Sequence, residues 1–507
     1  MKSEFQEKHF TEVKSDAAVV VFCKEDVDGL RNTKGFANLP FGRENEHVKS
    51  AITASEFQGE SGQQLMVFGL SYTRALVLIG LGQKDSITNE KLRRAAASGT
   101  KAIQSVFGNS NRKKNLKVVY STSSTIIERL TGYEAVHSIL EGALLSAYRY
   151  KKYLTVNNKS AEIDSFVVAF KELQTSIGRK AAQNARLVCD AVYFARDLAN
   201  APANEIYPET LADAATKMAR KYRIKSTVFD ERKIRTLRMG GLLAVSAGSS
   251  RAPRFIILEY KGNPHSKDTY VIVGKGITFD SGGISIKPSA GMAEMKMDMS
   301  GAAAVLGTLQ AVASLKLPVN VVGLAPCTEN LPSGSAYKPG DIVTTMSGLT
   351  IEVDNTDAEG RIILSDALYF AHRFNPKAII DLATLTGAVV VALGHHATGM
   401  FGTSEEIMAQ LREAGERTYE RVWPLPLFEE YEKQIKSDVA DVKNVGGKWA
   451  GSITAAAFLK KFTGNFPWVH LDIAGTAMLE EEMDYSPKGG SGVGVRLLTQ
   501  FFKQIAS

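Results

Sequence analysis

The chain has few cysteines and no long apolar run. Its 507 residues include three cysteines, Cys23, Cys189 and Cys327, which lie far apart and form no CxxC pair, so the sequence excludes a disulfide scaffold and favours a reducing compartment. The longest apolar runs, such as Ala17–Cys23 and Ala388–Leu393, are much shorter than the roughly 18 residues that span a bilayer. The first residues show no hydrophobic segment of a secretory signal. We therefore expect a cytoplasmic protein with no membrane partner.

The motifs of several enzyme classes are also missing. No GxSxG, HExxH or P-loop pattern occurs, and Gly274–Gly276 does not extend to GxGxxG because Phe279 occupies the last glycine position. His395 and His396 are adjacent, so they cannot both face one metal site from regular structure. These absences argue against a serine hydrolase elbow, a zinc helix with two histidines, a phosphate loop and a dinucleotide-binding turn.

The sequence does have the composition and patterning of a folded α/β protein. Hydrophobic residues make up 44% and charged residues 23% of the chain, and its length exceeds the roughly 250–300 residues at which a single core stops growing. Short strand-like runs, among them Ala75–Gly80 and Ala378–Asp381, alternate with helical patterns such as Asn89–Val106 and Gly301–Leu315. This alternation predicts two domains, a smaller N-terminal α/β domain with a partly parallel sheet and a larger C-terminal doubly wound α/β domain.

Changes in composition and in the pattern of predicted strands and helices suggest where the domains meet. We place the N-terminal domain at residues 1–175, a linking helix at 176–195 and the larger domain at 196–507. The larger domain is richer in glycine and in buried-type strands, so we expect it to carry the chemistry.

Positive charge is concentrated in one stretch. The net charge is +7, and residues 91–190 contain 17 basic and 7 acidic side chains. Such a stretch is typical of a solvated basic face, and it is also compatible with a nucleic-acid surface. Charge alone leaves both interpretations open.

The first of two unusual segments covers residues 274–304. It directly follows the predicted strand Tyr270–Val273, so Lys275 and Asp280 lie where that strand leaves the sheet. Asp298 comes just before a helix start rich in small residues. Taken singly, such a carboxylate is more often a helix cap or a favourable partner of the helix dipole than a functional group.

The second segment covers residues 353–368. Asp354, Asp357 and Glu359 lie within six residues, and Arg361 follows two positions later. In extended backbone, Asp357, Glu359 and Arg361 would alternate onto one face, where like charges repel unless a cation neutralises them. An acidic loop before a helix that begins at Arg361 is the structural interpretation, and a carboxylate metal site is the functional one.

Together the two segments supply four carboxylates near strand ends: Asp280, Asp298, Asp357 and Glu359. These hard oxygen ligands suit one or two divalent cations such as Mn, Zn or Mg. Two ions about 3.5–4 Å apart would activate water and polarise a carbonyl or phosphoryl oxygen. The spacing of the carboxylates alone does not favour a peptidase over a phosphoesterase, or the reverse.

Both segments are similar to those of one known family. NTDAEGR (355–361), GKGITFDSGG (274–283) and KMDMSGA (296–302) resemble motifs of the leucyl (cytosol) aminopeptidase family, the M17 metallopeptidases. The resemblance continues through ATLTGA (383–388), SDVADVKNVGG (437–447) and HLDIAG (470–475). It covers the larger domain, and the N-terminal third has no diagnostic motif.

The resemblance implies a set of metal ligands. Lys275 and Asp298 would bind one ion, Asp357 would bind the other, and Asp280 and Glu359 would bridge the two. A lysine ligand must lose its proton, which burial and adjacent cations make feasible. The implied cofactors are two divalent ions, Mn or Zn.

The resemblance also implies catalytic and substrate-binding residues. Lys287 would steady the substrate carbonyl and the oxyanion, and Arg361 would hold a bicarbonate ion that shuttles protons. The residues expected around the first side chain of the substrate are Met295, Thr384, Gly387 and Ala474.

The function that the resemblance implies is a metal-dependent aminopeptidase. It would release N-terminal residues, preferably leucine and other apolar ones, from peptides by attack of water held by two metals, and it would assemble as a homohexamer. Some bacterial relatives also bind DNA, so the basic stretch, with Arg112, Lys113 and Lys114, keeps open a second role as a DNA-binding regulator. A phosphoesterase is the competing enzyme class.

Overall fold

The computed structural model describes residues 1–32, 41, 44–108, 115–155 and 162–506. Its internal contacts divide the chain into two units. The N-terminal unit contains Met1–Cys189 and Glu482–Pro487, and the C-terminal unit contains Asp190–Glu481 and Lys488–Ser507. Each unit is built on a mixed α/β sheet, so the predicted fold class is confirmed.

The N-terminal unit alternates strands and helices. Its elements are β1 (Lys2–Gln6), β2 (Ala17–Phe22), α1 (Lys24–Asn32), α2 (Asn45–Ala54), β3 (Gln64–Phe68), β4 (Ala75–Gly80), α3 (Asn89–Gly108), β5 (Asn115–Thr122), α4 (Ser124–Leu130), α5 (Gly132–Ala147), β6 (Glu162–Ala169) and the first part of α6 (Thr175–Asn200). Among the described residues the strands lie in the order β1-β6-β5-β2-β4-β3. All pairs are parallel except β3 with β4.

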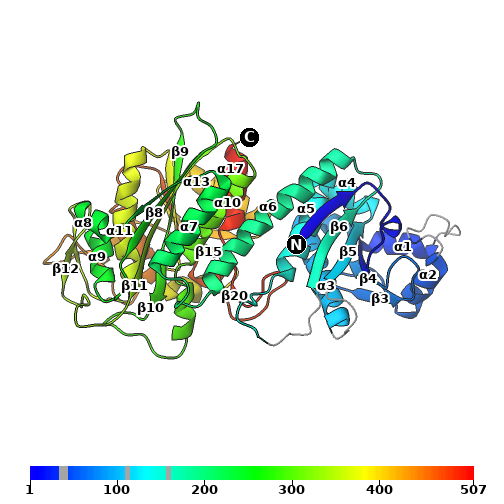
Figure 1. Ribbon diagram of the computed structural model, residues 1–507, viewed down its shortest axis with the longest axis horizontal. Coiled ribbons are helices and arrows are strands. Elements are labelled where there is room, and N and C mark those ends of the chain that lie inside the picture. Colours follow the sequence, from blue (N-terminus) through cyan, green and yellow to red (C-terminus); the bar gives the residue numbers. More distant parts are fainter. Residues whose placement is uncertain (33–40, 42–43, 109–114, 156–161, 507) are drawn as a thin grey trace. The chain divides into compact units, whose positions relative to one another are not determined.

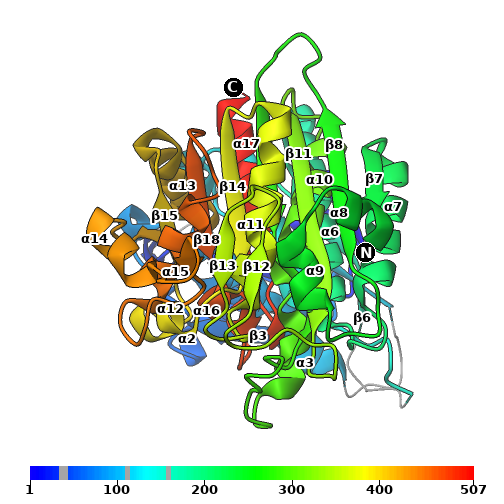
Figure 2. The same cartoon turned by 90° about the vertical axis from the view of Figure 1, so that its left-hand side faces the viewer.

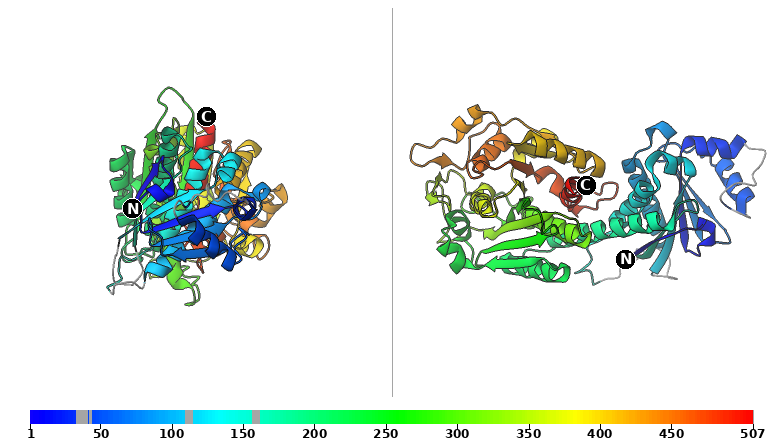
Figure 3. Two further views of the ribbon diagram at one scale, coloured as in Figure 1. Left: turned by 90° about the vertical axis from the view of Figure 1, so that its right-hand side faces the viewer. Right: turned by 90° about the horizontal axis from the view of Figure 1, so that it is seen from above.

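Helices cover both faces of the N-terminal sheet. α3 packs on β2 and β4, and α5 packs on β6 and on α3. α1 and α2 lie on the other face (Figure 3, right), and their side chains form an apolar cluster with Ala18, Val20 and Phe22 of β2. Because both faces are covered, β2 and β4 are buried along their whole length, which explains their continuous apolar sequence.

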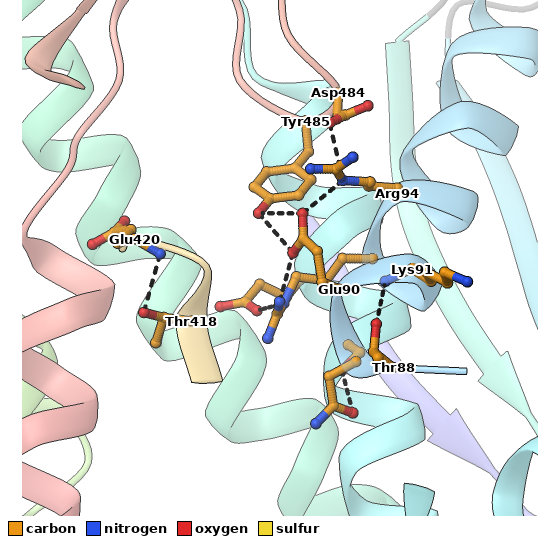
Figure 4. Close-up of polar contacts among 12 residues, drawn as sticks. Thr88, Glu90, Lys91, Arg94, Thr418, Glu420, Asp484 and Tyr485 are labelled. Atoms are coloured by element: carbon orange, nitrogen blue, oxygen red, sulfur yellow. Dashed lines mark hydrogen bonds and ion pairs between the residues drawn. The ribbon is translucent and has the colours of Figure 1, made fainter. Parts of the chain in front are cut away.

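Residues 482–487, here called the returning segment, come back to the N-terminal unit from the end of the chain. The Tyr485 hydroxyl lies 3.2 and 3.0 Å from the two carboxylate oxygens of Glu90, and Arg94 pairs with Asp484 at 3.1 Å. Figure 4 shows these contacts above α3. No local sequence pattern predicted this return.

The C-terminal unit continues with a larger set of elements. They are α7 (Pro208–Tyr222), β7 (Lys225–Phe229), α8 (Glu231–Thr236), α9 (Gly240–Ser246), β8 (Arg254–Lys261), β9 (Thr269–Gly274), β10 (Gly276–Asp280), α10 (Ser300–Ser314), β11 (Asn320–Asn330), β12 (Ile342–Thr344), β13 (Thr350–Glu352), α11 (Glu359–Ala371), β14 (Ala378–Ala383), α12 (Gly387–Leu393), β15 (Thr398–Gly402), α13 (Glu405–Thr418), β16 (Val422–Pro424), α14 (Glu429–Glu432), β17 (Val442–Lys443), α15 (Gly451–Lys460), β18 (Trp468–Asp472), α16 (Ala474–Ala477), β19 (Met478–Leu479), β20 (Gly489–Gly490) and α17 (Val495–Ile505).

The main sheet of this unit is parallel at its centre. Its order is β16-β15-β18-β14-β9-β11-β8-β7, with β10 paired to β11. β18, β14, β9 and β11 run parallel, while β15 and β8 pair antiparallel on either side of them. The carboxyl ends of the central strands therefore meet at one edge, where α/β proteins place their ligands.

Two helical layers enclose that sheet. α11 and α9 pack on one face, and α10 and α17 pack on the other (Figures 1 and 2). Strand β9 shows the alternation, because Val271 and Val273 join the core under α11 while the ring of Tyr270 packs edge-on against Phe501 and Phe502 of α17.

None of the helices in the described part of the chain is long and apolar enough to cross a membrane.

Candidate active site

Strand ends bring the two predicted segments together. Lys275 lies between β9 and β10, with its backbone N–H donating to the Leu382 carbonyl at 3.0 Å and its carbonyl accepting from the Ala302 N–H at 2.9 Å. Asp280 is the last residue of β10. Gly282 follows with φ +88°, and a Cβ there would lie 2.5 Å from the Ser285 carbonyl oxygen, so this close turn requires glycine.

Lys275 is surrounded by acceptors. Its Nζ lies 2.7 Å from Asp298 Oδ2 and 2.8 Å from Glu359 Oε1, and it donates to the Thr384 carbonyl at 2.9 Å. All three charged side chains are buried. A Cβ on Gly360 would lie 2.8 Å from Nζ, so the first turn of α11 can approach the lysine only with glycine at this position.

Lys287 joins the other two carboxylates. Its Nζ lies 2.9 Å from Asp280 Oδ2 and also pairs with Asp357. Asp357 and Lys287 keep 31% and 22% of their side chains exposed, whereas Asp280 is buried. This side of the cluster is therefore the one open to solvent.

The geometry of the carboxylates fits a cation site. Asp280, Asp357 and Glu359 offer ligand oxygens that all lie within 4.8 Å of one another. The buried Oε2 of Glu359 has no hydrogen-bond partner among the described residues. Oxygen donors at this spacing, with a lysine nitrogen beside them, are a ligand set that divalent metals accept.

The pKa shifts reflect surplus negative charge. Burial alone would lower the pKa of Lys275, but Asp298, Glu359 and Asp280 outweigh it and the pKa lies above its ordinary value. Lys287 behaves alike: burial lowers its pKa, and Asp280 and Asp357 reverse the shift. Four carboxylates face two ammonium groups, an imbalance that additional positive charge would relieve.

Arg361 lies in the first turn of α11, a little apart from the lysines. It donates from Nη1 to the Asn444 carbonyl at 2.8 Å, while its buried Nε has no partner in the described structure. Burial lowers its pKa to about 10. A buried guanidinium with an unused N–H is suited to an anion.

One local expectation about this segment is wrong. We expected Asp357, Glu359 and Arg361 to alternate in extended backbone, and a helix to begin at Arg361. Instead α11 begins at Glu359, so Glu359 and Arg361 are helical. A carboxylate in the first helical turn interacts favourably with the N-terminal dipole, which explains the earlier start.

The residues predicted to surround the substrate lie at neighbouring loop and helix starts. Thr384 follows β14 and donates from its hydroxyl to Asp298 Oδ1 at 2.6 Å. Met295 accepts from the Asp298 N–H through its carbonyl at 3.3 Å. Gly387 and Ala474 are the first residues of α12 and α16. Thr384, Met295 and Ala474 are partly exposed and Gly387 is exposed.

Sequence reasoning missed the residues that hold the acids in place. Asn330 pairs with Asp280 in the register of β10 with β11, and its Nδ2 donates to Asp280 Oδ1 at 2.8 Å and to the Thr356 carbonyl at 3.0 Å. Asn444 holds the other segment, because its Oδ1 accepts from the Asp354 N–H at 2.7 Å. The feature that could have pointed to this contact was a polar residue, Asn330, at the end of a buried strand.

Ion pairs neutralise several cations of the described basic stretch. Lys101 and Arg149 pair with Glu482 of the returning segment at 2.9 and 3.7 Å. Arg93 is buried against Glu141. Arg112, Lys113 and Lys114 lie outside the described residues.

Comparisons with known proteins agree with this geometry. The model of the cytosol aminopeptidase family, catalytic domain, matches residues 193–499, and that of its N-terminal domain matches residues 20–157. A probable cytosol aminopeptidase of Geotalea uraniireducens is 46% identical over 90% of this chain and 91% of its own length. One of Azotobacter vinelandii is 42% identical over 90% of each chain.

Solved structures are similar over nearly the whole chain. A mutant of tomato leucine aminopeptidase has a TM-score of 0.86 at 31% identity, covering 99% of this chain and 96% of its own. The bottromycin maturation enzyme BotP in complex with Mn has a TM-score of 0.83 at 30% identity, covering 98% and 100%.

Proposed function

The chain belongs to the cytosol aminopeptidase family and is therefore an aminopeptidase, a peptide hydrolase, and we propose that it uses two divalent metal ions and prefers N-terminal leucine and other apolar residues. The observation that carries this proposal is the convergence of four carboxylates on two lysines, with the buried Oε2 of Glu359 left without a partner. Membership of this family argues against a phosphoesterase, the enzyme class that the spacing of the carboxylates had left open.

The proposed ligands fall into two groups that share a member. Lys275 contacts both Asp298 and Glu359, and Asp280, Asp357 and Glu359 form the second group. Lys275 and Asp298 would hold one ion and Asp357 the other, with Asp280 and Glu359 bridging. Manganese or zinc suits this set, and BotP is a relative with Mn. When bound, the ions would supply Lewis acidity and an activated water.

Two cationic side chains have proposed catalytic roles. Lys287 lies at the solvent-open side of the cluster, where its ammonium group would donate to the carbonyl oxygen of the first peptide bond and stabilise the developing oxyanion. Arg361 would hold bicarbonate against its unused N–H, which when bound would supply a group able to accept and donate protons beside the departing amine.

The proposed substrate preference rests on four residues, of which Met295 and Thr384 contact Asp298. Met295, Thr384, Gly387 and Ala474 would surround the first side chain of the peptide. One methylene in an apolar pocket is worth about 1–3 kcal/mol, so we expect leucine and methionine to be favoured over alanine without strict exclusion.

A homohexameric assembly and a cytoplasmic location complete the proposal. All three cysteines are buried thiols, which suits a reducing compartment. DNA binding through the basic stretch is the alternative second function. It would require cations other than Arg94, Lys101 and Arg149, which already pair with the returning segment; loss of salt-sensitive DNA retention on neutralising Arg112, Lys113 and Lys114 would support it.

Hydrolysis of leucine p-nitroanilide tests the main proposal. The protein is stripped with chelator and assayed with Mn, Zn, Co or Mg added back, beside an N-acetylated substrate. We expect activity that metal restores and N-acetylation abolishes, because a free α-amine is required. Activity that survives chelation, or equal cleavage of the acetylated substrate, would contradict the proposal.

A further inference from the structure

Asp472, a buried carboxylate at the end of β18, joins two loops that flank the site. It is 1% exposed. Its Oδ1 accepts from the Leu385 N–H at 3.1 Å and from the Ala474 N–H at 3.2 Å. Its Oδ2 accepts from the Thr386 hydroxyl at 2.6 Å. One side chain therefore holds the loop after β14 and the start of α16 together.

The loop after β14 is also held from its other side. Thr384 accepts from Lys275 through its carbonyl at 2.9 Å and donates to Asp298 from its hydroxyl at 2.6 Å. Residues 384–386 are thus hydrogen-bonded to the lysine–carboxylate cluster on one side and to Asp472 on the other. The register supports the arrangement, because Asp472 pairs with Ala383 across β14 and β18.

Asp472 differs from the four carboxylates of the cluster. Both of its oxygens accept from neutral donors of the loops, and it is outside the group of carboxylates whose oxygens approach one another. Its hydrogen bonds are made within the protein, so a ligand is not needed to satisfy it. The role open to it is positional.

We propose that Asp472 is a positioning residue that sets the distance between the two walls of the pocket for the first substrate side chain. Thr384 and Ala474 form those walls in the proposed function, on which this inference rests. By fixing residues 384–386 to Ala474, Asp472 places the pocket at a set distance from Lys275 and Asp298. It does not touch the reacting atoms.

The variants separate this role from general damage. D472A removes all three acceptor contacts, whereas D472N keeps one oxygen that can accept from the Leu385 and Ala474 N–H groups. The matched control is D381N, on the neighbouring strand β14. Asp381 is equally buried, but it binds His470 at 2.6 Å and Trp468 at 2.7 Å and contacts neither loop.

Two measurements test the inference. Hydrogen–deuterium exchange should be about tenfold faster in peptides covering 384–387 and 473–477 of D472A, because the N–H groups lose their acceptor. The kcat/KM ratio of leucine to alanine p-nitroanilide should fall by about tenfold, mainly through KM for leucine. D472N should keep most of the native protection from exchange and most of the native leucine-to-alanine ratio. D381N should change neither the exchange rate nor the ratio.

The outcomes distinguish the two proposals. Faster exchange with no leucine hydrolysis by the native protein would support the positioning role and contradict the proposed substrate. Native exchange together with an unchanged leucine-to-alanine ratio in D472A would overturn the inference. If D472A does not fold, D472E takes its place because the extra methylene shifts the carboxylate, and native exchange together with an unchanged leucine-to-alanine ratio in D472E would overturn the inference as well.

Discussion

Each unit of this protein contains a cluster of paired acids and bases, and the two clusters differ in the ratio of acids to bases. In the N-terminal unit four acids meet four bases, namely Glu90, Glu141, Glu482 and Asp484 with Arg93, Arg94, Lys101 and Arg149. None of these carboxylate oxygens is a buried atom without a partner in the described part of the chain. In the C-terminal unit four acids meet two lysines, and a Glu359 oxygen is left over.

The difference separates a structural cluster from a functional one. A balanced network has its charges compensated by its own partners and specifies how segments pack, as Tyr485 and Asp484 do for the returning segment (Figure 4). A cluster with surplus charge is costly unless a ligand completes it. Replacing an acid should therefore lower activity in the C-terminal unit, whereas replacing an acid of the N-terminal cluster should lower stability.

Removing a surplus carboxylate should have the largest effect, and it should fall on activity. For Glu359→Gln we expect aminopeptidase activity to fall by about 10³-fold, since an anionic ligand and bridge is lost. The thermal midpoint of the metal-free variant should not fall, because one of four like charges is gone. Glu329→Gln, a buried acid of the same unit that binds Ser249 and Arg251, is the control and should stay active. A Glu359→Gln protein within tenfold of native activity would break the comparison.

Removing a balanced carboxylate should act on stability instead. Glu141→Gln removes one of the two carboxylates that pair with the buried Arg93, Glu90 being the other, and breaking a buried pair costs up to about 3–5 kcal/mol. We expect the N-terminal unit to unfold at lower urea concentration, while kcat on leucine p-nitroanilide at 25 °C is retained. An unchanged urea midpoint, or a loss of kcat with the unit still folded, would show that the N-terminal cluster is not purely structural.

Metal removal should affect only one unit. Ligand at about 100 times its Kd stabilises the state that binds it by about 2.7 kcal/mol. Chelation should therefore abolish activity and lower the unfolding midpoint of the C-terminal unit, and leave that of the N-terminal unit in place. Calorimetry with and without added Mn²⁺ measures both, and a shift confined to the N-terminal transition would contradict the account.

The smallest expected effect concerns the returning segment. Tyr485→Phe removes the phenol hydroxyl that contacts Glu90, and one such bond is worth about 0.5–1.5 kcal/mol. We expect a slightly lower urea midpoint and faster proteolysis within residues 480–488, with activity unchanged. Proteolysis at the native rate would show that the ion pairs of Asp484 and Glu482 suffice to hold the segment.

Sequence reasoning found the acids of the site because they lie in short segments at strand ends. Asp280, Asp298, Asp357 and Glu359 are local features, and the parallel order of the sheet brings them together. Lys275 was singled out at the same strand end as Asp280, and the family motifs added Lys287 to this set. Predicted strands such as Ala75–Gly80 match the observed elements because a continuous apolar run fits a strand buried on both faces.

The residues that depend on distant pairing escaped prediction. Asn330 contacts Asp280 across 50 residues and Asp472 contacts Leu385 across 87, and no periodicity encodes such a pair. The returning segment is a further case, since its acids meet basic residues more than 300 positions earlier. Only part of the charge excess of the basic stretch, at Arg94, Lys101 and Arg149, is paired with acids from the far end of the chain.

Titration of the metal-stripped protein with Mn²⁺, followed by calorimetry, tests the central claim most directly. The account predicts two ions per chain in the native protein and in Glu329→Gln, and a loss of at least one of them in Glu359→Gln. No binding by the native chain, or equal binding by Glu359→Gln, would contradict the proposal that the surplus carboxylates hold two metal ions.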